Sequence, residues 1–163
     1  MSSTIHASAV LAGSGAVLIR GPAGAGKSRL ALDLLDAAQT GLLAFARLVA
    51  DDRAHVEAAH GRLLVRPAEA LKGLIEVRGL GIRRLPFEPV AMVGLVVDLA
   101  ADDGARLPDP AAATTNITGI TLPRLALAPG IEPFRVVLAA LRAAEGRAKP
   151  AVATDLAAAR QSL

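Results

Sequence analysis

The sequence predicts an α/β domain, in which helices pack on a central sheet, and two adjacent segments carry that prediction. The run 16–20 is short, aliphatic and partly β-branched, as is typical of a buried strand. Residues 27–39 follow after a glycine-rich stretch, and their leucines recur at helical spacing. A strand, a glycine loop and a helix in direct succession are characteristic of an α/β unit.

The other elements follow from the same patterns. Strands are expected at 5–11, 42–57, 61–67 and 90–99, where apolar residues dominate. A second helix is expected at 132–145, with an apolar side made of Val136, Val137, Leu138 and Leu141. The stretch 101–119 is rich in Asp, Gly, Pro and Thr and is expected to be a loop. The Ala-rich end, 146–163, is expected to be a tail or a short helix.

Composition narrows the class of protein. The chain has 163 residues, enough for one domain, with 53% hydrophobic and 20% charged residues and a net charge of +3. It has no cysteine, which excludes a disulfide framework and a cysteine nucleophile. Three phenylalanines without Trp or Tyr cannot form the stacking platform of a single-strand nucleic-acid binder. No apolar run reaches the roughly 18–20 residues of a membrane span. We therefore expect a soluble, cytoplasmic protein that binds neither nucleic acid nor membranes.

One motif points to a ligand. The residues match G-x-x-x-x-G-K-[ST] between a predicted strand and a predicted helix, and they read Gly21-Pro22-Ala23-Gly24-Ala25-Gly26-Lys27-Ser28. The glycines let backbone N–H groups turn inward around an anion, and the helix adds its positive end. Lys27 would supply a charge for the β- and γ-phosphates, and Ser28 would offer a hydroxyl to Mg²⁺. The motif predicts ATP or GTP binding.

A pair of carboxylates follows the next apolar segment. Asp51 and Asp52 end a predicted strand, where a metal-binding carboxylate of such proteins would lie. Neighbouring side chains on a strand point in different directions, so the two suit different tasks. One could hold Mg²⁺ and the other could accept a proton from an incoming hydroxyl. The alternative is a solvated acidic turn.

Four ordered motifs resemble the catalytic domain of the HPr kinase/phosphorylase family, which acts on a serine of the phosphocarrier protein HPr. The segments are Ile5-His6, the glycine loop, Leu48-Val49-Ala50-Asp51-Asp52-Arg53, and the signature Ile75-Glu76-Val77-Arg78-Gly79-Leu80-Gly81-Ile82. Arg106-Leu107 is similar to a later pair. The resemblance runs from about residue 4 to 145. It implies a P-loop sheet with helices, similar to the PEP-carboxykinase-like core, over residues 1–145, in a short form without the family's N-terminal domain.

The resemblance also implies roles for particular residues. Asp51 would be the general base and His6 would help to position the phosphate, with Arg78 and Arg106 near the reaction centre. Ser28, Asp52 and Glu76 would serve Mg²⁺, although the sequence leaves open which aspartate is the base. The implied activity is ATP-dependent phosphorylation of HPr in phosphotransferase-system regulation, with phosphorolytic dephosphorylation in two-way members. Family members are typically hexamers.

Departures from the family pattern keep other functions open. Ala7 replaces a glycine after the histidine, which would alter how His6 approaches its target. The stretch 128–132 lacks the basic turn of longer members, which puts HPr docking or effector control in question and leaves open a kinase without phosphorylase activity. A small-molecule P-loop kinase would predict an arginine-rich lid, and no such stretch stands out. A regulatory nucleotide-binding module without catalysis would tolerate loss of Asp51. His55, His60 and the Asp102-Asp103 pair are interpreted as surface residues.

Overall fold

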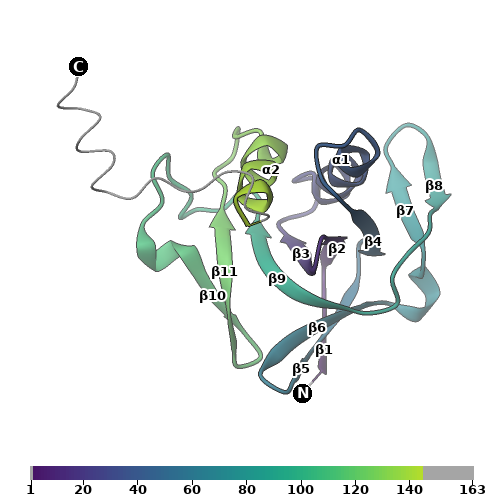
Figure 1. Cartoon of the computed structure of the whole chain (residues 1–163), viewed down its shortest axis with the longest axis horizontal. Coiled ribbons are helices and arrows are strands. Elements are labelled where there is room, and N and C mark those ends of the chain that lie inside the picture. Colours follow the sequence, from purple (N-terminus) through teal and green to yellow (C-terminus); the bar gives the residue numbers. More distant parts are fainter. Residues whose placement is uncertain (1, 145–163) are drawn as a thin grey trace.

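The computed structural model describes residues 2–144, so the predicted tail at 146–163 lies outside it. Its main sheet has the order β1-β5-β6-β9-β3-β2-β4, with β11 joined to β9 and β10 joined to β11 (Figure 1). Its strands are β1 Ser2–Ile5, β2 Ala7–Ala12, β3 Gly15–Arg20, β4 Ala46–Ala50, β5 Ala54–Ala59, β6 Arg62–Pro67, β9 Ala91–Asp98, β10 Thr114–Ile117 and β11 Ile120–Ala126. A separate hairpin pairs β7 Leu74–Val77 with β8 Gly81–Arg84.

Three strands run parallel and end at one edge of the sheet. β9 pairs in parallel with β3 on one side and β11 on the other. Arg20 is in register with Asp98, and Asp98 with Ala126, so the three carboxyl ends are level. Ligand sites of open α/β sheets form at such edges. The glycine loop leaves this edge from β3.

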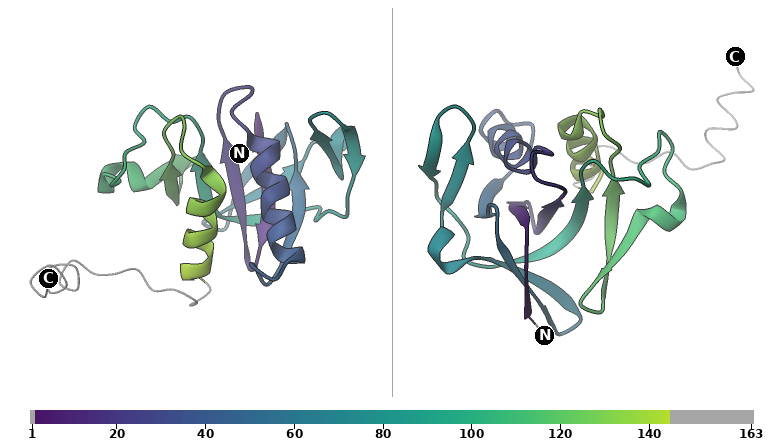
Figure 2. Two further views of the ribbon diagram at one scale, coloured as in Figure 1. Left: turned by 90° about the horizontal axis from the view of Figure 1, so that it is seen from above. Right: turned by 180° about the vertical axis from the view of Figure 1, so that it is seen from behind.

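Two helices cover one face of the sheet, α1 Lys27–Gln39 and α2 Pro133–Ala144, and they lie side by side (Figures 1 and 2). Leu30 and Leu34 of α1 and Val137 of α2 are buried in the same apolar cluster as the sheet residues Ile19 and Val97. A second cluster fills the other face, which the curled sheet closes with side chains from β5, β6, β10 and β11. The predicted α/β class is confirmed. No helix in residues 2–144 is long and apolar enough to cross a membrane.

The strand boundaries differ from prediction at two points. The expected strand 5–11 is interrupted at His6, because β1 pairs with β5 whereas β2 pairs with β3 and β4. The expected strand 42–57 is two strands, since Asp52 has a left-handed backbone (φ 68°) that an extended strand cannot contain.

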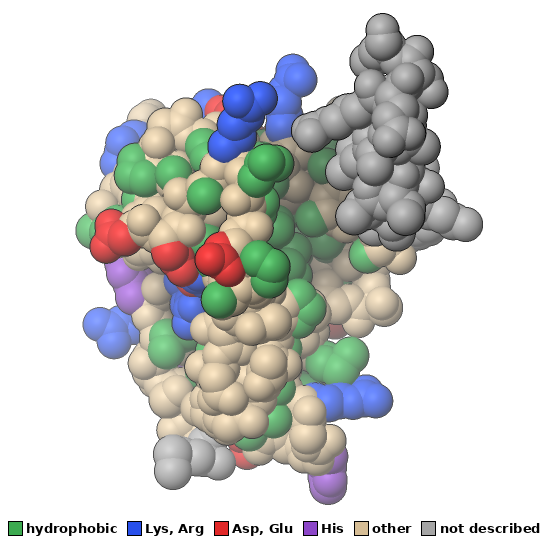
Figure 3. All heavy atoms as spheres, turned by 90° about the vertical axis from the view of Figure 1, so that its left-hand side faces the viewer, with side chains coloured by type: hydrophobic (Ala, Val, Ile, Leu, Met, Phe, Trp, Pro, Cys, Tyr) green, Lys and Arg blue, Asp and Glu red, His purple; other side chains and the backbone are tan. Residues whose placement is uncertain are grey.

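The expected loop 101–119 is partly ordered. It holds a short 3-10 helix, Pro110–Ala113, and strand β10, which forms a hairpin with β11. Thr114 and Thr115 favour strands because they are β-branched, and the tip at Thr118-Gly119 takes left-handed conformations. Figure 3 views this side of the molecule, where the hairpin forms a largely uncharged ridge below a group of acidic side chains.

Candidate functional site

The glycine loop, Gly21–Gly26, joins the end of β3 to the start of α1. Gly24 and Gly26 have left-handed backbones (φ 79° and 98°), and a Cβ at either would meet nothing within 4 Å. The loop therefore needs glycine for its conformation and not for space. The N-terminus of α1 has no side-chain cap and no acidic residue in its first turn. Its free N–H groups and positive end suit an anion.

Lys27 lies folded across this loop. Its side chain is buried, and Nζ donates hydrogen bonds to the carbonyl oxygens of Gly21 (2.8 Å) and Pro22 (3.0 Å). The ammonium is thus held at the loop by backbone oxygens. Phosphate oxygens entering the loop would compete with those carbonyls for a charged donor, and charged acceptors form the stronger bonds.

Asp51 accepts hydrogen bonds from three segments that are far apart in the sequence. Its carboxylate is buried, and Oδ1 accepts hydrogen bonds from the hydroxyls of Ser8 and Ser28, both at 2.7 Å. Oδ2 accepts the backbone N–H of Glu76 at 3.2 Å. These donors satisfy a buried charge that would otherwise be costly. Asp51 is thereby tied to the hydroxyl at the start of α1.

Asp52 turns the other way, toward solvent. Its Oδ1 lies 2.8 Å from His6 Nε2, and both side chains are more than half exposed. The left-handed backbone at Asp52, a conformation that Asp tolerates better than most residues, separates the two carboxylates. His6, at the break between β1 and β2, is placed to meet it.

A cavity of about 620 Å³ opens above the loop. The glycine loop and the first turns of α1 form one wall. The other residues that line the cavity are His6, Ser8, Asp52, Glu76, Val77, Arg78, Glu132 and Pro133. The fold thus brings together most of the site residues predicted from sequence, with Asp51 in contact with Ser28. Arg106 is different: it is exposed on the segment after β9 and is not among the residues that line the cavity.

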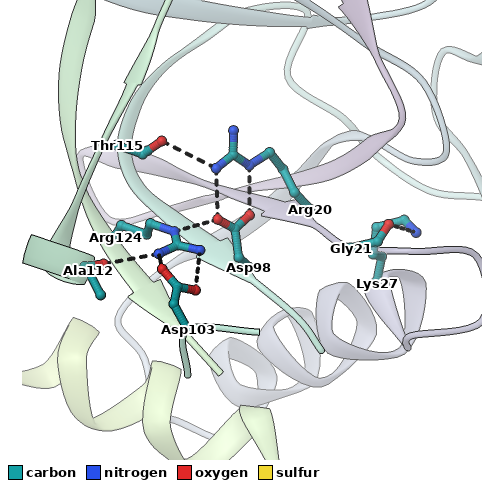
Figure 4. A network of polar contacts seen from close by, with 8 residues as sticks. All are labelled: Arg20, Gly21, Lys27, Asp98, Asp103, Ala112, Thr115 and Arg124. Carbon is teal, nitrogen blue, oxygen red and sulfur yellow. Dashed lines mark hydrogen bonds and ion pairs between the residues drawn. The ribbon is translucent and has the colours of Figure 1, made fainter. Parts of the chain in front are cut away.

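A second polar network adjoins the loop and was not predicted from sequence (Figure 4). Arg20, directly before Gly21, donates two hydrogen bonds to Asp98, both at 2.7 Å. Arg124 donates to Asp98 at 2.5 Å and forms a bidentate pair with Asp103 at 2.6 and 3.0 Å. The side chain of Asp103 is about half exposed, as expected of a surface residue, but it is anchored to β11.

Burial and neighbouring charges have opposite effects on the pKa of Asp98. Its partial burial would raise the pKa of the carboxyl, but hydrogen bonds and charge from Arg20 and Arg124 outweigh burial and leave that pKa below its ordinary value. Sequence signals for this network are weak, because Arg20 and Asp98 are 78 residues apart and each ends an ordinary apolar strand. Ser8 was missed for a similar reason, since a single serine inside an apolar strand has no pattern.

The site also suits a divalent metal. Within residues 2–144 no group of three or more His, Asp or Glu side chains forms a ready-made metal cage. Mg²⁺ rarely uses such a cage, because it keeps waters and phosphate oxygens and takes one or two protein oxygens. The Ser28 hydroxyl, against the Asp51 carboxylate, is an oxygen donor of that kind beside the phosphate loop.

The fold is an α/β domain, and a glycine loop followed by an uncapped helix N-terminus at the carboxyl edge of parallel strands is an arrangement that suits a phosphate group. Comparison with known proteins gives a family. The model of the HPr Serine kinase C-terminal domain matches residues 1–86, more than half of the chain, and the chain belongs to that family.

Individual relatives agree. An HPr kinase/phosphorylase of Streptococcus thermophilus (strain ATCC BAA-491 / LMD-9) is 48% identical over 67 residues, which are 40% of this chain and 19% of that protein. One from Halalkalibacterium halodurans is 36% identical over 101 residues, 57% of this chain and 30% of that protein. The chain therefore aligns with less than a third of these relatives' length.

A solved structure shares the fold. The Hpr(Ser) kinase/phosphatase from Coxiella burnetii superposes with a TM-score of 0.71 at 24% identity, over 89% of this chain and 97% of that chain. Because this match covers 89% of the chain, the likeness of fold extends beyond residue 86, where the family model ends. The predicted resemblance to the HPr kinase catalytic domain is confirmed.

Proposed function

We propose that this domain transfers the γ-phosphoryl group of ATP to a serine of the phosphocarrier protein HPr. The observation that carries the proposal is the meeting of Ser28 with Asp51 beside the glycine loop, with the Asp52–His6 pair on the wall of the same cavity. A phosphate-binding loop by itself does not show which reaction a protein catalyses. Phosphoryl transfer to an alcohol requires a phosphate-binding loop, a hydroxyl that can bind the metal ion (here Ser28) and an accessible carboxylate (here Asp52).

The phosphate-binding part would work as follows. The backbone of Gly21, Pro22, Ala23, Gly24, Ala25, Gly26, Lys27 and Ser28 would surround the phosphates of ATP. Lys27 would exchange its carbonyl partners for phosphate oxygens, and Ser28 would bind Mg²⁺. Mg²⁺, when bound, would supply positive charge that offsets the negative charge of the phosphate groups. Glu76 and Arg78, which also line the cavity, would face the transferred group.

The two aspartates would divide two tasks, and their contacts favour one division. Asp51 is buried and orients the Ser28 hydroxyl, which suits the metal side of the site. Asp52 is on the cavity wall with His6, where a protein hydroxyl could approach, which suits the proton acceptor. Family resemblance implies the opposite division, with Asp51 as the base, and the variants below separate the two.

The reaction balances with these groups. The serine Oγ forms a bond to the γ-phosphorus while the bond from that phosphorus to the β–γ bridging oxygen breaks, and ADP leaves. The hydroxyl proton moves to the carboxylate. In the phosphorolytic reaction, an oxygen of inorganic phosphate would form a bond to the phosphorus of phosphoserine while the bond from that phosphorus to the serine Oγ breaks. The carboxylate would pass the proton of inorganic phosphate to Oγ, and pyrophosphate would leave. Arg106 would contribute its charge only if its segment approached the cavity, so its catalytic role stays a prediction.

The test is transfer of labelled γ-phosphate from ATP to purified HPr from the same cell, with Mg²⁺. Wild-type protein should label HPr on serine, and Lys27→Ala should not. An unlabelled HPr in the presence of bound ATP would contradict the proposal and favour a regulatory nucleotide-binding module. Label on a small hydroxyl compound in place of HPr would favour a small-molecule kinase.

Paired variants assign the two aspartates. If Asp52 is the proton acceptor, Asp52→Asn should lower kcat by about 100-fold or more at unchanged Mg²⁺ dependence. Asp51→Asn should instead raise the Mg²⁺ concentration needed for half-maximal rate. The reverse pattern would give the base role to Asp51. We further propose that the protein works in the cytoplasm and that it forms a homo-oligomer. Sedimentation of the purified chain would test the oligomeric state.

A further inference from the structure

The β7–β8 hairpin stands at the edge of the molecule, apart from the main sheet (Figures 1 and 2). Every residue of β8 is exposed. Ile82 and Leu80, two residues apart in the sequence, are 59% and 58% exposed, which is unusual for large aliphatic side chains. Exposed apolar groups that gather in this way commonly mark an interaction surface.

The register of the hairpin shows which way this surface faces. Ile82 is opposite Glu76, and Arg84 is opposite Leu74. Directly paired residues project from the same face of a two-stranded sheet. Ile82 and Arg84 therefore share the face of Glu76, a residue that lines the cavity. The other face is held to the body of the protein by Ile75, which is 1% exposed.

The charge on the hairpin is mostly positive. Arg78, Arg83 and Arg84 are exposed, and within residues 2–144 none of the three forms an ion pair. Glu76 is the single carboxylate of the segment 74–84. Unpaired arginines beside exposed aliphatic residues complement a partner surface that is both acidic and apolar.

We infer that the hairpin is a docking surface for the protein that carries the acceptor serine, and that it binds an acidic segment with apolar side chains next to that serine. This inference rests on the proposed function. Leu80 and Ile82 would contact the apolar side chains, and Arg78 and Arg84 would face the carboxylates. Because Glu76, Val77 and Arg78 belong to both hairpin and cavity wall, a segment bound there places its neighbouring serine at the cavity.

Two other occupants match these features less well. A second copy of this chain carries a net charge of +3, so it is a poor electrostatic match for an arginine-rich surface. A nucleic acid would use the arginines but would gain little from the two aliphatic side chains, and the hairpin has no aromatic residue for stacking.

The experiment measures phosphorylation of HPr as a function of HPr concentration. The variants are Leu80→Ser with Ile82→Ser, and separately Arg84→Glu. Their matched controls are Val90→Ser, at an exposed aliphatic residue outside the hairpin, and Arg66→Glu, at an exposed arginine on β6. We expect each hairpin variant to raise KM for HPr by about tenfold or more. The KM for ATP and the kcat at saturating HPr should change less than about twofold, and the controls should match wild type.

Several results would overturn the inference. An unchanged KM for HPr in both hairpin variants would contradict it while leaving the proposed function intact. A wild-type protein that labels no HPr would instead contradict the proposed function. Circular dichroism of each variant shows whether the hairpin residues affect folding. Concentration-dependent sedimentation that is lost only in the hairpin variants, with KM unchanged, would identify a second copy as the occupant, and retention on duplex DNA at low salt would identify nucleic acid.

Discussion

Asp98 shows at the scale of one residue how the sheet edge is held. Its carboxylate lies between Arg20 and Arg124, so it joins the ends of three neighbouring parallel strands. Arg20 is also the last residue before the glycine loop. Because Asp98 on β9 holds Arg20, its carboxylate also helps to fix the position of Gly21, the first residue of the loop.

Replacing Asp98 by Asn should destabilise the fold, since both arginines would lose a charged partner. We expect the free energy of unfolding to fall by about 2–3 kcal/mol, below the loss from a fully buried pair because Arg20 is partly exposed. Urea denaturation measures this value. Asp102→Asn, at a neighbouring exposed residue, is the control and should change stability by less than about 0.5 kcal/mol.

The lowered pKa of Asp98 gives a pH dependence of known sign. The folded-state pKa is below the unfolded value, so the stabilisation is fully present above about pH 4 and is lost as pH falls through the folded pKa. Wild type should therefore lose stability on acidification more steeply than Asp98→Asn in this range. Equal slopes in both proteins would contradict the assignment.

Ser8 provides a second prediction at this scale. Its buried hydroxyl donates to Asp51, so Ser8→Ala removes one donor from a buried carboxylate. We expect a loss of about 1–3 kcal/mol in thermal or urea unfolding. Ser2→Ala, at an exposed residue of β1, should leave stability unchanged.

At the scale of elements, the segment after β9 depends on close backbone packing. A Cβ at Gly104 would lie 2.3 Å from the backbone nitrogen of Ala128, closer than any real contact. The same segment is held by the hydrogen bond from Ala101 N–H to the Leu127 carbonyl and by the Asp103–Arg124 pair. The segment that carries Arg106 is thus attached to the β11–α2 connection.

Gly104→Ala should displace this segment or destabilise the protein by about 1–3 kcal/mol. Gly94→Ala is the matched control, because a Cβ there meets its nearest atom at an ordinary 3.5 Å. Thermal unfolding compares the two variants. Equal stability of the Gly104 variant and wild type, with unchanged hydrogen exchange at Ala101, would contradict the packing seen here.

The sequence predicted elements best where the pattern was local. The strand at 16–20, the helix at 27–39 and the second helix follow from periodicity and from glycine or proline at their ends. Strand β10 was missed because its threonines lie in a stretch rich in turn residues, and only pairing with β11 orders them. Motif spacing identified the cavity-lining residues His6, Lys27 and Glu76, whereas Asp98 and Ser8 act through partners distant in sequence.

At the scale of the whole molecule, ligand binding and folding are linked. The loop, α1 and the aspartates come from segments that meet only in the folded chain. A nucleotide that binds there should stabilise the protein by about 2.7 kcal/mol at a concentration 100 times its dissociation constant. Differential scanning fluorimetry with Mg²⁺ and ATP should show a higher Tm for wild type. Lys27→Ala should show no shift, and AMP should shift wild type less than ATP.

Strand β9 belongs to both apolar clusters, with Val96 in one and Val97 in the other, and it pairs with β6, β3 and β11. It begins at Ala91, beyond the stretch 1–86 that the family model matches. A fragment that ends at residue 86 would keep the four sequence motifs of the family. Without β9, however, strands β3 and β6 would each have an unpaired edge, and both apolar clusters would lose the strand that they share. Truncation at that point should give an aggregating, uncooperative polypeptide, so recognisable motifs and an independently folding unit do not coincide in this chain.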